Sequence, residues 1–148
     1  MKTKSSSPPS LTVLVRRVSS LLRRVTASAS SAVKATSVRL SYPDVKIPFD
    51  ARIGRGVSIS ATDGGLIQVG RNVAIWPSVQ LVARGGQIII GDNVHVGTGT
   101  IVVSTGAIEI GDDTLIAEYV VIRDQDHALT SAPIRSSGFE TAGVHIGN

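Results

Sequence analysis

Cysteine is absent from the 148 residues of this chain, and aromatic residues make up only 3% of it. Without cysteine the protein has no disulfide, no thiolate nucleophile and no cysteine-ligated zinc. The scarcity of aromatic residues indicates an interior filled by branched aliphatic side chains. No apolar run approaches about 18 residues, so the sequence predicts no transmembrane helix.

Acidic residues are absent from residues 1–43, which carry eight Lys or Arg. Residues 44–148 carry seven basic residues against eleven acidic ones, a balance of −4. We therefore predict a basic extension over 1–43 and a separate repeat domain over 44–148. Nucleic-acid binding is not expected, because the excess of positive charge belongs to the extension alone.

An aliphatic residue returns every six positions through most of the repeat domain. The series is Ile47, Ile53, Ile59, Val69, Ile75, Leu81, Ile90, Val96, Val102, Ile110, Ile116 and Ile122. Each group of three is followed by two to four extra residues, which gives a coil of roughly 20 residues.

A period of six fits a short strand followed by a tight corner. Gly54, Gly70, Gly91 and Gly111 follow aliphatic positions, and Asn or Asp comes next in several coils, as corners require. The pattern predicts an all-β fold in which coils stack into a three-sided parallel prism. A β-sandwich is the alternative, but nothing in a sandwich maintains a strict six-residue phase.

Residues 11–25 have helical spacing of Leu and Val, with arginines on the other side. We predict one amphipathic basic helix here, followed by an Ala/Ser-rich linker to about Val38. The helix could pack on the prism or on a sister subunit, bind an anionic membrane surface, or belong to an organelle transit peptide. A secretory signal is disfavoured because Arg16 and Arg17 interrupt the apolar region.

The six-residue phase breaks after Ile122, and about 16 residues must leave the prism before Ile146. Long excursions from a regular scaffold often carry function. Asp124, Asp126 and His127 stand at this exit, and Asp126 falls on a position that usually holds Val or Thr. A neutral imidazole can take a proton from a hydroxyl, and a carboxylate can orient it. His127 is therefore a candidate general base, with a surface histidine in a polar turn as the alternative.

The other two histidines have simpler interpretations. His95 is expected on an exposed face or at a trimer contact, and His145 on the surface. A zinc site built from all three, as in γ-class carbonic anhydrases, is disfavoured because no close His-x4-His pair is present. We expect no metal.

The register IGDNVH (90–95) and IGDDTL (110–115) resembles the hexapeptide-repeat acyltransferases, whose fold is a left-handed parallel β-helix. The resemblance covers residues 47–148. VIRDQDH (121–127), PIR (133–135) and TAGVHIGN (141–148) are similar to the part of galactoside, maltose and polysaccharide O-acetyltransferases that carries the catalytic histidine and its loop. His127 matches the general base of that family.

The resemblance implies direct transfer of an acetyl group from acetyl-coenzyme A to a saccharide hydroxyl or a glycan precursor, with His127 as base. It also implies a homotrimer with active sites between subunits. Two departures stand out: VGTGT (96–100) replaces an Asn-rich acceptor segment, and the coils that bind coenzyme A are expected mostly beyond Asn148. We expect a cytoplasmic protein, peripheral to the membrane if its helix binds lipid. A non-catalytic trimeric scaffold or an inactive remnant is the alternative.

Overall fold

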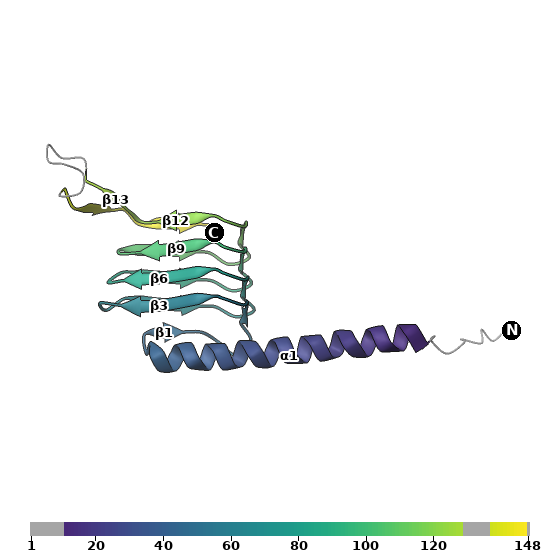
Figure 1. The fold of residues 1–148 in the computed structure, drawn as a ribbon. Helices are drawn as coiled ribbons and strands as arrows, with labels where there is room; N and C mark the ends of the chain where they lie inside the picture. Colours follow the sequence, from purple (N-terminus) through teal and green to yellow (C-terminus); the bar gives the residue numbers. More distant parts are fainter. Residues whose placement is uncertain (1–10, 129–136, 148) are drawn as a thin grey trace.

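The computed structural model describes residues 11–128 and 137–147, which form one long helix and a parallel β-solenoid (Figure 1). Helix α1 spans Leu11–Ser41. The strands are β1 (Val45–Lys46), β2 (Arg52–Ile53), β3 (Ser58–Thr62), β4 (Leu66–Val69), β5 (Ala74–Ile75), β6 (Gln80–Arg84), β7 (Gln87–Ile90), β8 (His95–Val96), β9 (Ile101–Ser104), β10 (Ala107–Ile110), β11 (Leu115–Ile116), β12 (Val121–Arg123), β13 (Gln125–His127), β14 (Phe139–Thr141) and β15 (Val144–Ile146).

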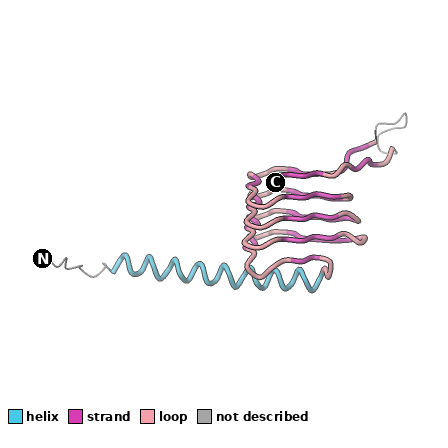
Figure 2. Tube along the Cα trace, turned by 180° about the vertical axis from the view of Figure 1, so that it is seen from behind, coloured by secondary structure: helices cyan, strands magenta, loops and turns pink. Residues whose placement is uncertain are grey.

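Three parallel sheets form the sides of the solenoid, as the six-residue period predicted (Figure 2). We call the sheet β1-β4-β7-β10-β15 the first sheet, the sheet β2-β5-β8-β11 the second, and the sheet β3-β6-β9-β12 the third. Each coil contributes one strand to each sheet. The predicted three-sided parallel β-helix with an N-terminal helix is confirmed.

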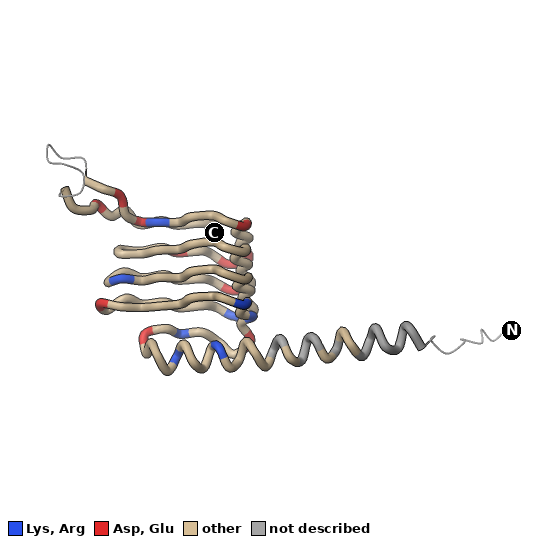
Figure 3. The backbone as a smooth tube through the Cα atoms, in the orientation of Figure 1, with Lys and Arg blue, Asp and Glu red and all other residues tan. Residues whose placement is uncertain are grey.

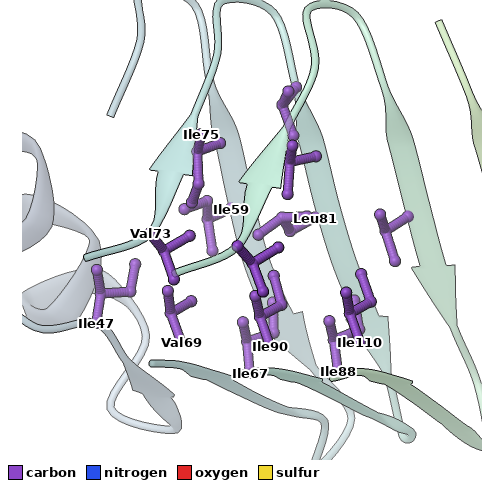
Figure 4. Packing of buried hydrophobic residues seen from close by; sticks show 14 of the residues in the cluster. Ile47, Ile59, Ile67, Val69, Val73, Ile75, Leu81, Ile88, Ile90 and Ile110 are labelled. Atoms are coloured by element: carbon purple, nitrogen blue, oxygen red, sulfur yellow. The ribbon is translucent and has the colours of Figure 1, made fainter. Parts of the chain in front are cut away.

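The core consists of the aliphatic series that set the repeat, and all twelve of its members are buried. Pairing in register places like residues directly above one another, as in Ile53, Ile75 and Val96 of the second sheet. Figure 4 shows the resulting stack of Ile and Val side chains between the three sheets. Every coil presents side chains of the same size and shape to the next coil. Bulky aromatic rings do not fit this interior.

The corner between the first and second sheets is a polar ladder. Asn72, Asn93 and Asp113 each adopt positive φ there, which Asn and Asp tolerate better than other side chains. Asn72 Nδ2 donates to Asn93 Oδ1, and Asn93 Nδ2 donates to Asp113 Oδ1, each at 3.0 Å. Arg71 and Asp92 add an exposed ion pair at 2.7 Å, and the charged residues of this corner are visible along one edge of the stack in Figure 3.

Helix α1 covers the open end of the first coil. Ser31 Oγ accepts a hydrogen bond from the backbone N–H of Ile53 at 3.0 Å, and Lys34 Nζ donates to the carbonyls of Ile53 and Gly54 at 3.2 and 2.7 Å. Ala35 is fully buried in the same core cluster as the first coil. These contacts satisfy the outer edge of β2, which would otherwise be free to pair with another chain.

The predicted Ala/Ser-rich linker is therefore wrong, because α1 continues unbroken to Ser41. Alanine has the strongest helix propensity, and small side chains allow the helix backbone to approach the first coil closely.

Among residues 11–128 and 137–147, no helix combines the length and apolar character that crossing a membrane requires.

Candidate functional site

The chain leaves the solenoid after β12 as a two-stranded antiparallel hairpin, β13 and β14, which projects from the last coil in Figure 1. The register pairs Gln125 with Thr141, Asp126 with Glu140 and His127 with Phe139. The chain then returns to the first sheet, where β15 pairs with β10. Residues 129–136, which include the PIR segment, lie outside the described residues.

Asp124 fixes the point of exit. It follows β12 in a column whose earlier members are Ala61, Ala83 and Ser104, so its carboxylate occupies an inward position and is only 3% exposed. Asp124 Oδ2 accepts hydrogen bonds from Ser104 Oγ at 2.6 Å and from the N–H of Gly106 at 2.8 Å. Asp124 Oδ1 accepts from the N–H of Thr105 at 2.9 Å.

These hydrogen bonds keep the carboxylate ionised. Burial raises the pKa of Asp124, but the bonds from the Ser104 hydroxyl and from the Thr105 and Gly106 N–H groups act in the opposite direction, and the net pKa lies below the ordinary value. The carbonyl of Asp124 also accepts from the N–H of Ala142 at 2.9 Å, which joins the outgoing and returning segments. Asp124 is thus the anchor of the hairpin base.

Asp126 lies outside the solenoid. Its side chain is exposed, and Oδ1 accepts a hydrogen bond from the backbone N–H of His127 at 2.7 Å. The expectation that Asp126 fills a Val/Thr position is wrong, because the chain turns out of the prism at Asp124, two residues earlier. The carboxylate that breaks the core pattern is that of Asp124.

His127 lies on β13 with its side chain exposed. The imidazole stacks on the ring of Phe139, with centroids 4.7 Å apart and planes inclined by 34°. Among the residues that the structure describes, this ring contact, and not a carboxylate, orients the imidazole. The role of Phe139 could not be read from the sequence, because it depends on the register of a hairpin whose loop length does not specify it.

An open cavity of about 430 Å³ lies at the base of the hairpin. Its lining includes Arg123, Gln125 and Glu140, together with residues 141–144 of the returning segment. The cavity therefore combines a cation, carboxylates and an amide close to the strand that carries His127. Such a lining suits a ligand with hydroxyl groups.

A second open cavity, of about 350 Å³, lies on the outer face of the second sheet. Trp76, His95, Leu115 and Glu118 contribute to its lining. His95 is half-buried on β8 between Ala74 of β5 and Leu115 of β11. Its position on an outer face agrees with the sequence expectation.

His145 pairs with Glu109 across β10 and β15, and its Nδ1 lies 3.4 Å from Glu109 Oε2. Both side chains are exposed, as expected for a surface histidine. The three histidines lie on the second sheet, on the hairpin and on the first sheet. Within the described part of the chain, no three His, Asp or Glu side chains gather as a metal site.

The structure is thus a parallel β-solenoid from which an anchored hairpin projects, and this hairpin carries the exposed imidazole of His127. The chain is 34% identical, over 98 residues, to the probable acetyltransferase Rv3034c of Mycobacterium tuberculosis (strain ATCC 25618 / H37Rv). The match covers 64% of this chain, and the chain spans about a third (33%) of the relative's length. No family model matches the sequence, and no solved structure matches it.

Proposed function

We propose that this protein takes part in acetyl transfer from acetyl-coenzyme A to a hydroxyl group, with His127 as the general base. Two lines of evidence support the proposal: the homology to a probable acetyltransferase, and the imidazole that a rigid solenoid holds on an anchored hairpin. The position of His127 is the main support, because a general base must be accessible to its acceptor and yet held in place.

In the proposed reaction, a ring nitrogen of His127 takes the proton of the acceptor hydroxyl while the hydroxyl oxygen attacks the thioester carbonyl carbon. The carbon–sulfur bond then breaks, and the sulfur leaves with the proton that the imidazolium returns. Phe139 limits the orientations of the imidazole, and Asp124 fixes the hairpin without touching the reacting atoms. Asp126 holds the β13 backbone through the His127 N–H and acts as a positioning residue.

We further propose that the acceptor is a saccharide hydroxyl or a glycan precursor. The polar lining of the cavity at the hairpin base, with Arg123 and Glu140, supports an acceptor that presents several hydroxyl groups. We propose a homotrimer as well. Exposed Trp76, Leu115 and Tyr119, on the second sheet and at its edge, offer an apolar surface that a second copy would cover.

Thiol release from acetyl-coenzyme A, followed with a panel of mono- and oligosaccharides, tests the proposal. His127→Ala should lower kcat by about 10²- to 10⁴-fold. His145→Ala, which removes another exposed histidine from a neighbouring coil, is the matched control and should retain wild-type activity. Full activity in His127→Ala would contradict the role of His127 as base, and thiol release that does not depend on a hydroxyl acceptor would contradict transfer to a hydroxyl group.

A further inference from the structure

Helix α1 uses only one of its sides to cover the solenoid. Ser31 and Ala35 face the first coil and are buried. Val33 lies two residues from each of them, on the opposite side of the helix, and is 70% exposed. Leu22 and Leu40 lie on the same side as Val33, because about five helical turns separate residues 18 apart, and they are 61% and 81% exposed. We call Leu22, Val33 and Leu40 the outer stripe.

Before Leu22 the sequence continues with Leu and Val at helical spacing, and it carries four arginines between residues 16 and 24. This part of α1 extends well beyond the solenoid in both Figure 1 and Figure 2, so the first coil does not cover it.

We propose that α1 binds an anionic lipid surface. In this arrangement the outer stripe enters the lipid–water interface, and the solenoid lies on the side of the helix that faces away from the lipid. Exposed apolar side chains along one side of a basic helix are typical of helices that lie in the plane of a membrane. Residues 1–43 carry eight cations and no acid, so the charge of an anionic leaflet complements them. A second copy of α1 fits less well, because it would bring arginines together without any carboxylate to pair with them.

The position of α1 in the fold agrees with this arrangement. α1 lies across the end of the stack, roughly perpendicular to the direction in which the coils stack (Figure 1). The outer stripe points away from the first coil, and Arg39 lies over the exposed ring of Phe49 at 5.0 Å beside it. The hairpin with His127 lies at the opposite end of the stack. With strands about 4.8 Å apart, three coil spacings place it about 14 Å above the first coil.

Co-sedimentation of the 148-residue protein with phosphatidylcholine vesicles, with and without phosphatidylserine, tests the proposal. Wild-type protein should bind the anionic vesicles, and the binding should weaken severalfold when salt rises from about 0.05 M to about 0.5 M. The double variant Leu22→Gln/Val33→Gln should bind at least about tenfold more weakly, because two side chains no longer enter the apolar layer. Glutamine is a good helix former, and circular dichroism should show unchanged helix content.

The matched control is Val121→Gln/Phe139→Gln, which removes two apolar side chains of similar exposure (57% and 62%) far from α1, and it should bind vesicles as the wild type does. Three results would overturn the proposal: no binding to anionic vesicles, equal binding of the stripe variant and the wild type, or equal binding to both kinds of vesicle. If lipid binding is absent and the stripe variant alone changes the mass in sedimentation equilibrium, the outer stripe contacts a second copy instead.

Discussion

Substitution of Asp124 should loosen the hairpin that carries His127, and the loss in stability can be estimated from the hydrogen bonds of Asp124. In Asp124→Asn, one carboxylate oxygen becomes an amide nitrogen. If the nitrogen takes the place of Oδ2, it faces the N–H of Gly106, and if it takes the place of Oδ1, it faces the N–H of Thr105. The Ser104 hydroxyl can turn to accept, but a backbone N–H cannot.

Asp124→Asn thus leaves one backbone N–H without its acceptor in either orientation, at a cost of about 1–3 kcal/mol. Asp124→Ala leaves both N–H groups without their acceptor and should cost about 2–6 kcal/mol. Alanine fits the position sterically, because Ala61 and Ala83 occupy it in earlier coils. Ser104→Ala removes only the hydroxyl donor and should cost about 1 kcal/mol.

Hydrogen exchange of β13 and β14, measured by mass spectrometry, reports local opening of the hairpin. Protection should fall in the order wild type, Ser104→Ala, Asp124→Asn, Asp124→Ala, while protection of β4 to β7 stays unchanged. Urea denaturation of the same variants measures the loss in global stability. Equal protection in wild type and Asp124→Asn would refute the anchoring role.

The lowered pKa of Asp124 gives a pH dependence: its stabilising contribution is complete above the unfolded value of about 3.9 and is lost as pH falls through the folded value. Hairpin protection should therefore drop in acid in the wild type and not in Asp124→Asn, as hydrogen exchange corrected for intrinsic rates would show. Gly65→Ala should lower the stability measured by urea denaturation strongly, because a Cβ at this position would lie 2.5 Å from the Ala83 carbonyl oxygen. Gly64→Ala is the control: a Cβ there meets no atom within 4 Å, so the substitution should cost only about 1–2 kcal/mol for its positive φ. Arg71→Ala should leave the urea midpoint almost unchanged, since the ion pair with Asp92 is exposed, and a clear loss of stability would mean that the corner ladder depends on this ion pair.

The sequence was sufficient to predict the solenoid because its signal is repeated. Twelve aliphatic positions in one phase specify strands, corners and an interior at the same time, and an error at one position does not alter the period. The extent of α1 was missed because Ala favours a helix whereas Ser favours caps and turns, so a segment rich in both has no single preference. Burial of Ser31 and Ala35 against the first coil decides for the helix.

The exit was only partly predictable. The break in phase marked the region of Asp124, Asp126 and His127, but the repeat could not say at which residue the chain turns outward. That residue is decided by the inward position above Ser104 and by two backbone N–H groups that need an acceptor. The ring contact between His127 and Phe139 arises from pairing across the hairpin, which no spacing in the sequence records.

Direct acetyl transfer with His127 as base can be tested by a rapid-quench single turnover with labelled acetyl-coenzyme A and an accepted saccharide. The label should move to the saccharide hydroxyl in one step, without acetylated protein, and His127→Ala should slow this step by about 10²- to 10⁴-fold. Label that accumulates on the protein before it reaches the saccharide, or an unchanged rate in His127→Ala, would contradict a direct transfer with His127 as base.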